Sequence, residues 1–186
     1  MGRLIYTLNV SLDGYVESRQ GSLDWGTVDD ELHLWFNRHA AQVEASLYGR
    51  GLYETMARYW PTAEQDPAAT GPMREFARIW NATPRIVFST TLKEVESGSR
   101  LVQGDVGEVL RAVRQEFAGD LEVGGPTLAS QFVRRGLVDE YGLLVHPVIL
   151  GGGKRYLPDL ESPIPLRLAE TRTFESGVVY LGYRAA

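Results

Sequence analysis

Residues 136–157 read GLVDEYGLLVHPVILGGGKRYL. The apolar residues between Asp139 and Leu150 predict a long strand, and the three glycines of 151–153 predict its end. His146 and Pro147 interrupt the apolar run, which is also much shorter than the roughly 20 residues of a membrane span. The segment therefore predicts a strand in the core of a globular domain and gives no indication of a membrane anchor.

The segment just before it predicts a strand followed by a helix, a pair that recurs along the chain. Residues 120–123 predict a strand that runs into Gly124 and Gly125, and residues 128–135 predict a helix with Pro126 near its first turn. Further back, the pair Asp105 and Glu108 forms a capping box for a helix at 106–117. Strand, helix, strand and helix thus alternate, which favours parallel strands with helices between them.

The remaining chain continues this pattern. We predict strands at 4–10, 45–48, 85–89 and 100–103, helices at 28–41, 52–60 and 73–80, an exposed loop at 61–72, and a hairpin at 166–183. The expected fold is α/β, with a mixed, mainly parallel sheet, helices on both faces and an antiparallel C-terminal hairpin. No internal repeat or long linker divides the chain, so we expect a single domain over residues 1–186.

Composition excludes several classes of function. The 186 residues carry a net charge of −5 and no cysteine. Disulfides, thiolate metal sites and cysteine nucleophiles are therefore excluded. The acidic balance gives no basic face for nucleic acid, and no signal peptide or membrane span is evident. The three histidines form no HExxH motif, so no metal site is expected. We expect a cytoplasmic protein without nucleic-acid or membrane partners.

Two junctions in which a strand meets a helix through glycine are candidate anion sites. Gly49 and Arg50 form the first, where backbone N–H groups and a guanidinium could hold a phosphate. Gly124 and Gly125 form the second, with the hydroxyl of Thr127 beside the helix start. Taken alone, the first junction could also be a tight turn with a surface arginine, and the second could reflect close packing of strand and helix. In a parallel sheet, however, both lie at the carboxyl ends of strands, where ligands bind.

Hydroxyl and carboxylate groups provide further candidates at that edge. Ser89 and Thr90 end a third strand and could bond phosphate or ribose, or simply close a turn. Asp13 follows the first strand and could orient or protonate a substrate; the alternative is a turn with Gly14. Trp25 could cover a flat ligand or act as a buried anchor.

These residues resemble the dihydrofolate reductase-like superfamily, and most of all the reductase domain of bifunctional riboflavin biosynthesis enzymes. The resemblance covers nearly the whole chain. It rests on VSLDGY (10–15), GSLDW (21–25), LYGRGLYE (47–54), VFSTTL (87–92), LEVGGPTL (121–128) and the block at 136–157. The last block is the most specific of the six, and the others occur in the expected order.

The resemblance implies an NADPH-binding reductase, often a homodimer. It implies that the cofactor is held by Gly49, Arg50, Ser89, Thr90, Gly124, Gly125 and Thr127. Many relatives carry arginine at the position of Thr90, which leaves Arg50 as the main residue for the 2′-phosphate. Asp13 matches an aspartate near the nicotinamide and the substrate, and Trp25 matches a loop over the active site.

The expected function is hydride transfer from NADPH to a C=N or C=O carbon of a small heterocyclic or sugar-derived substrate, similar to 5-amino-6-(5-phosphoribosylamino)uracil reductase. Two alternatives remain open. One is a true dihydrofolate or pteridine reductase, in which Asp30, a loose match to the carboxylate of the first helix, would be the catalytic group. The other is a dinucleotide-binding protein without turnover. The basic pair Lys154 and Arg155 could bind a substrate phosphate or form a solvated loop.

Overall fold

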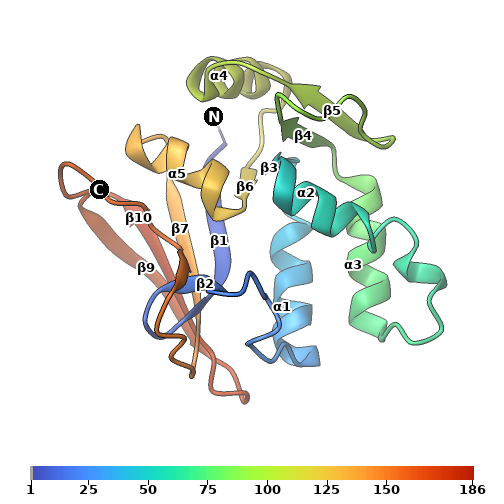
Figure 1. The fold of residues 1–186 in the computed structure, drawn as a ribbon, viewed down its shortest axis with the longest axis vertical. Coiled ribbons are helices and arrows are strands. Elements are labelled where there is room, and N and C mark those ends of the chain that lie inside the picture. The colour runs from blue at the N-terminus through green and yellow to red at the C-terminus, as the bar shows by residue number, and fades with distance from the viewer. Residues whose placement is uncertain (1) are drawn as a thin grey trace.

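The computed structural model describes residues 2–186 and is built around an eight-stranded sheet (Figure 1). In spatial order its strands are β5 (Ser99–Val102), β4 (Arg85–Phe88), β3 (Ala45–Gly49), β6 (Leu121–Gly124), β1 (Leu4–Ser11), β7 (Glu140–His146), β10 (Val179–Ala185) and β9 (Leu166–Thr173). Neighbours from β5 to β7 are parallel, whereas β10 is antiparallel to both β7 and β9. The predicted mainly parallel sheet with an antiparallel hairpin is confirmed.

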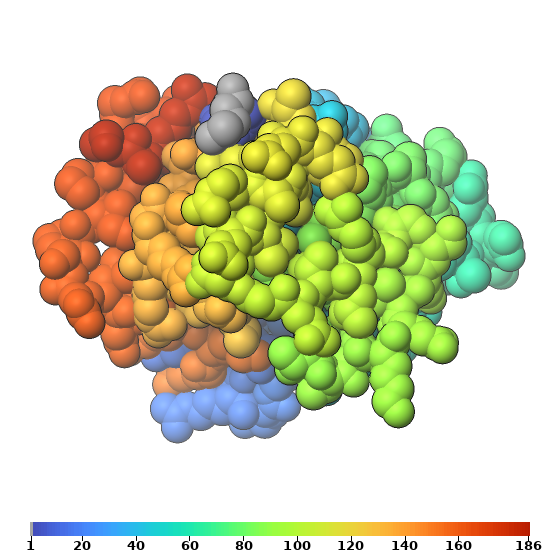
Figure 2. Space-filling view, turned by 90° about the horizontal axis from the view of Figure 1, so that it is seen from above, coloured from blue at the N-terminus to red at the C-terminus, as the bar shows by residue number. Residues whose placement is uncertain are grey.

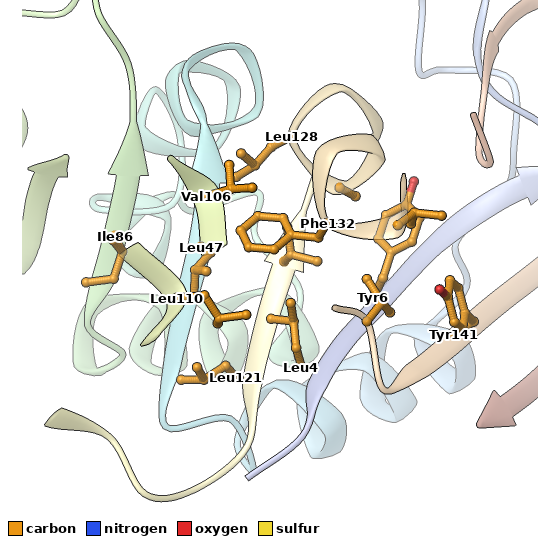
Figure 3. Packing of buried hydrophobic residues seen from close by; sticks show 14 of the residues in the cluster. Leu4, Tyr6, Leu47, Ile86, Val106, Leu110, Leu121, Leu128, Phe132 and Tyr141 are labelled. Carbon is orange, nitrogen blue, oxygen red and sulfur yellow. The ribbon is translucent and has the colours of Figure 1, made fainter. Parts of the chain in front are cut away.

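One face of the sheet is covered by α4 (Val106–Glu116) and α5 (Pro126–Arg134). Their apolar side chains join those of β1, β3 and β6 in one buried cluster. Figure 3 shows Phe132 of α5 among Leu4, Leu47 and Leu110 of that cluster. The predicted N-cap of α4 is confirmed, because the Asp105 carboxylate accepts hydrogen bonds from the N–H groups of Gly107 and Glu108. Among residues 2–186 the Glu108 side chain makes no return bond to the Asp105 N–H, so the predicted capping box forms only in part. Figure 2 shows α4 in yellow-green on the outside of the molecule.

The opposite face is covered by α1 (Asp30–Ala40), α2 (Arg50–Ala57) and α3 (Gly71–Ala82). Trp35 of α1 packs on Tyr180 of β10, with ring centroids 4.4 Å apart. A second aromatic cluster joins Tyr48 of β3 to Trp80 of α3. The helices therefore lie on both faces, as predicted. No helix among residues 2–186 is both long and apolar enough to cross a membrane.

The segment at 139–157 differs from its prediction. The strand β7 ends at His146, because Pro147 has no N–H to continue the ladder. The glycines of 151–153 then lead into a short strand, β8 (Gly153–Arg155), which pairs with β2 (Tyr15–Ser18) in a separate two-stranded sheet.

The basic pair in this segment belongs to the strand β8. The Lys154 ammonium lies 2.7 Å from the Glu17 carboxylate, and the Arg155 guanidinium lies 5.9 Å from the Tyr15 ring centroid. Both side chains therefore have neighbours in β2.

The prediction that residues 61–72 form an exposed loop is wrong in part. A 3-10 helix, η1 (Ala63–Gln65), lies in this segment, and the side chains of Ala63 and Ala69 are buried. Small side chains let the segment pack closely against α3 without a visible apolar pattern in the sequence.

Candidate functional site

Three neighbouring parallel strands, β4, β3 and β6, end side by side at one edge of the sheet. Gly49 at the end of β3 is in register with Phe88 at the end of β4, and Tyr48 is in register with Gly124 at the end of β6. The helices α2 and α5 begin directly after β3 and β6. The structure therefore brings the seven predicted cofactor residues to one edge: Gly49, Arg50, Ser89, Thr90, Gly124, Gly125 and Thr127.

The N-termini of α2 and α5 differ from those of the other α-helices. The helices α1, α3 and α4 begin with Asp29, Thr70 and Asp105, whose side chains accept a hydrogen bond from the first turn. By contrast, α2 and α5 begin with Gly49 and Gly125, which offer no side-chain cap. The N–H groups of the first turn of α2 therefore stay available, as do those of Thr127 and Leu128 in α5, where Pro126 itself has no N–H. Each N-terminus also carries the positive end of a helix dipole.

The side chains at this edge are polar and accessible. The Arg50 guanidinium is 54% exposed in its side chain, lies 3.9 Å from the Glu54 carboxylate and donates a 3.1 Å hydrogen bond to the Thr91 hydroxyl. The Ser89 hydroxyl accepts hydrogen bonds from the N–H groups of Thr91 and Leu92, so it shapes the turn after β4. Thr90 and Thr127 are exposed. The arrangement can hold an extended anion along two neighbouring helix starts.

A cavity of about 690 Å³ lies between the sheet and the helices α1, α2 and α3. Gly124 lines it, so the cavity begins at the junction of β6 with α5. Apolar side chains from all three helices and the loop after α2 line it, namely Phe36, Leu52, Met56, Trp60, Met73 and Phe76. A cavity of this size and lining suits a small, flat organic molecule.

Glu122 of β6 brings a carboxyl group into this cavity. Burial raises the pKa of the Glu122 carboxyl to about 7. Residues 2–186 provide no hydrogen-bond donor to it, and burial alone accounts for the shift. We did not predict a role for Glu122 from the sequence, although a glutamate in the middle of a strand covered on both faces is unusual enough to be a signal.

Two histidines of α1, His33 and His39, line the cavity. Burial lowers the pKa of the His33 imidazole, and the nearby charges of Asp30 and Glu75 oppose that effect. The ring lies 6.1 Å from the ring centroids of both Trp60 and Phe76. His33 therefore adds a polar group, largely uncharged at neutral pH, to an aromatic wall.

A family model described as the RibD C-terminal domain matches residues 3–180. The chain belongs to the RibD C-terminal domain family. This confirms the resemblance to the reductase domain of bifunctional riboflavin biosynthesis enzymes that the sequence motifs indicated.

Individual relatives of this RibD C-terminal domain agree with that assignment. A Bacillus subtilis (strain 168) protein with the name "Uncharacterized protein YyaP" is 33% identical over 182 residues, which are 97% of this chain and 94% of that protein. The structure of a putative riboflavin biosynthesis protein from Shewanella sp. PV-4 is similar with a TM-score of 0.79 and 21% identity, covering 99% of both chains. A dihydrofolate reductase from Enterococcus faecalis, complexed with NADP(H), has a TM-score of 0.65 and 14% identity over 99% of this chain and 96% of its own. The two structures show a shared fold.

In this RibD C-terminal domain the Asp13 carboxylate is engaged by the protein itself. It accepts hydrogen bonds from the N–H groups of Leu150 and Gly151, at 3.0 and 2.7 Å, and from the Ser11 hydroxyl at 2.7 Å. These donors, the Leu150 N–H first, hold the pKa of the Asp13 carboxyl below its usual value. Asp13 thus ties the turn after β1 to the segment after β7, and its predicted contact with substrate stays a prediction.

Replacing Asp13 by alanine tests this role in the loop. We expect the amide hydrogens of Leu150 and Gly151 to exchange several-fold faster in the variant, because both lose their acceptor. The matched control is Asp24→Ala, which removes an exposed carboxylate from the following loop. Hydrogen exchange followed by NMR gives the result, and unchanged exchange at both amides would contradict the role.

The other two predicted site residues lie outside the lining of the cavity. Asp30 is exposed at the start of α1, where its charge acts on His33. Trp25 is half-buried, and its indole N–H donates a 3.2 Å hydrogen bond to the Val16 carbonyl. Its ring meets His146 edge-on at 5.4 Å. Of the two readings left open for Trp25, these contacts favour the anchor.

Metal ligands are not gathered anywhere in the described part of the chain. No group of three or more His, Asp or Glu side chains among residues 2–186 could hold an ion. The third histidine, His146, is buried, and its Nε2 lies 2.8 Å from the amide oxygen of Asn9.

Proposed function

We propose that this chain is an NADPH-dependent reductase that transfers a hydride to a C=N or C=O carbon of a small heterocyclic or sugar-derived substrate. The observation that carries the proposal is the cavity that begins at Gly124, beside two helix N-termini that glycine leaves uncapped. Membership of the RibD C-terminal domain family supports a reductase of this type.

The residues at the sheet edge fit the cofactor. The N–H groups at the starts of α2 and α5 would hold its pyrophosphate, with Thr127 beside them, and Arg50 would bind the 2′-phosphate with the hydroxyls of Ser89 and Thr90 nearby. When bound, the cofactor supplies the hydride. The protein supplies the cavity, which positions the substrate and limits the access of water.

The alternative of a true dihydrofolate reductase has less support. The carboxylates at the start of α1, Asp30 and Glu31, do not line the cavity, and Glu31 instead bonds Arg172 at 2.7 Å.

A homodimer remains part of our proposal. The edge strand β9 exposes Leu166 and Leu168 and would be available for such an assembly, which sedimentation of the purified protein measures.

Titration with NADPH and NADH tests the proposal, with quenching of tryptophan fluorescence as the readout. We expect NADPH to bind more tightly than NADH, and Arg50→Ala to weaken NADPH binding by roughly 10- to 100-fold. That range follows from the loss of one charge-assisted hydrogen bond pair, because each 1.4 kcal/mol is tenfold in affinity. NADH binding should change little.

The matched control for this titration is Arg58→Ala, which removes an arginine from the opposite end of α2. Equal affinities for NADPH and NADH in the wild-type protein would contradict the role of Arg50. Absence of binding in folded protein would contradict the proposed cofactor.

A further inference from the structure

Glu122 lies on the floor of the cavity, close to the junction that would hold the cofactor. In the parallel ladders of the sheet it is in register with Ile5 of β1 and Ser46 of β3. Gly124, where the junction begins, is two residues further along β6, roughly 7 Å away at the rise of a strand. Both residues line the same cavity. A ring bound beside the junction would therefore lie within reach of the carboxyl group.

The other charged groups of the cavity lie at the end away from Gly124, and most of them pair with one another. Arg3 bonds both Asp120 and Glu140, and Arg184 bonds Glu140 at 3.0 Å. Glu170 of β9 lines the same end and is exposed. None of these residues reaches the Glu122 carboxyl with a hydrogen bond or ion pair, so Glu122 is left without a counter-charge from this cluster.

Burial disfavours the charged form of three other titratable groups around the cavity. Burial lowers the pKa of the His33 imidazole, and burial raises the pKa of the Tyr48 phenol and that of Tyr180, the latter to about 12. His39 bonds the Trp35 carbonyl through Nδ1 at 2.8 Å and stacks on that indole. Among residues 2–186 no side chain donates a hydrogen bond or forms an ion pair with the Glu122 carboxyl group, so it retains a proton at pH values where other carboxyl groups have lost theirs.

The proposed reaction requires a proton, and the Glu122 carboxyl group lies where it could supply one. Reduction of a C=N or C=O bond adds a hydride to carbon and a proton to the heteroatom. Resting on the proposed function, we propose that Glu122 is the catalytic acid that supplies this proton. The π electron pair moves onto the nitrogen or oxygen, which takes the proton from the Glu122 carboxyl group as its O–H bond breaks. The resulting carboxylate is later protonated again by water.

The charge of the cofactor ring and the proton of Glu122 should be coupled. If the reduced nicotinamide ring were bound beside Glu122, it would add no charge and would displace water, and both effects would favour the protonated carboxyl group. The positive charge of the oxidised ring in the same place would favour the Glu122 carboxylate. The acid would therefore hold its proton before hydride transfer and be stabilised as an anion after it.

Proton exchange on binding tests this inference without knowledge of the substrate. Calorimetry of NADPH and of NADP⁺ binding at pH 7, in two buffers that differ in ionisation enthalpy, gives the number of protons taken up or released. The 2′-phosphate titrates with a pKa near 6 in both forms, so the difference between the two forms isolates the effect of the ring. We expect greater proton uptake with NADPH than with NADP⁺.

Two variants assign that difference to a residue. In Glu122→Gln the difference should disappear while NADPH still binds within a few-fold of the wild-type affinity. In Glu161→Gln, which changes an exposed glutamate before β9, the difference should persist. A difference that is absent from the wild-type protein, or that persists in Glu122→Gln, would overturn the inference while leaving the proposed function intact. If neither nucleotide binds, the proposed function itself fails.

A second measurement does not depend on any variant. NMR of protein with ¹³C-labelled glutamate follows the carboxyl carbon of Glu122 directly during a pH titration. We expect it to titrate near pH 7 in the free protein, at higher pH with NADPH and at lower pH with NADP⁺. Titration at the ordinary pH of a glutamate in all three states would overturn the inference.

Discussion

Glu122→Gln is expected to raise the free energy of unfolding at pH 9 by about 2–3 kcal/mol and to leave it nearly unchanged at pH 4. Burial raises the pKa of the Glu122 carboxyl from 4.5 to about 7. Each unit of pKa corresponds to about 1.4 kcal/mol, so this rise corresponds to about 3.5 kcal/mol, and we expect a smaller effect because the group faces a cavity that water can enter.

The sign follows from the proton balance. Below pH 4.5 the carboxyl group is protonated in both the folded and the unfolded chain, so its ionisation contributes nothing to stability. Between pH 4.5 and pH 7 the unfolded chain loses this proton first, and the folded state becomes progressively less stable. Above pH 7 the full cost is present. Glutamine cannot ionise, so the variant avoids this cost.

Urea unfolding at pH 5, 7 and 9 measures the effect, with Glu161→Gln as the matched control. The two variants should diverge as the pH rises, because Glu161 is exposed and lies outside the cavity. Parallel stability curves for Glu122→Gln and the wild-type protein would show that the carboxyl group is adequately solvated, and would remove the physical basis for its raised pKa.

A carboxyl group in this position is costly to the fold, which makes its presence informative. Its neighbours in register, Ile5 and Ser46, carry no charge that could compensate for the buried carboxylate. Residues that reduce stability in this way are common where function requires them. Glu122 thus lowers the stability of the fold but would be required for proton transfer. A Glu122→Gln variant that is more stable and no longer exchanges a proton on binding would demonstrate both effects.

The parts of the fold that the sequence predicted are those with strong local signals. The strand β1 alternates apolar and polar residues, and α4 has both a capping box and an apolar stripe; both elements form as predicted. The small sheet of β2 and β8 was missed because Tyr15–Ser18 pairs only with Gly153–Arg155, far along the chain. Neither segment carries an alternation long enough to predict a strand.

The candidate site was predicted unevenly for a similar reason. The local pattern of a glycine between a strand and a helix indicates the junctions at Gly49 and Gly124. The parallel order of the strands then brings both junctions to one edge of the sheet. The cavity depends instead on how α1, α2 and α3 cover the sheet, which no local pattern specifies. The raised pKa of Glu122 comes from that covering. The sequence LEVGG shows a glutamate inside a strand, but it does not specify which helices cover that residue.

Gly125→Ala is expected to weaken NADPH binding by roughly 100-fold, the largest effect on binding among these predictions. Gly125 begins α5 with a φ of +85°, a conformation that alanine adopts only with strain of about 1–3 kcal/mol. An added methyl group would also lie 3.3 Å from the Cβ atom of Leu52. Because Leu52 belongs to α2, the methyl group would enter the gap between the two helix N-termini. Loss of two backbone hydrogen bonds to a charged phosphate, at about 1.5 kcal/mol each, gives the expected factor.

The chain provides a matched control at the other end of the same helix. Gly136 follows α5 with a φ of +62°, and a methyl group added there would meet no atom within 4 Å. Gly136→Ala should therefore lose stability by about 1–2 kcal/mol through backbone strain while binding NADPH normally. Fluorescence titration and urea unfolding of both variants separate the two effects. If Gly136→Ala weakened NADPH binding as much as Gly125→Ala, strain in α5 would explain the loss, and the phosphate site at the start of the helix would be contradicted.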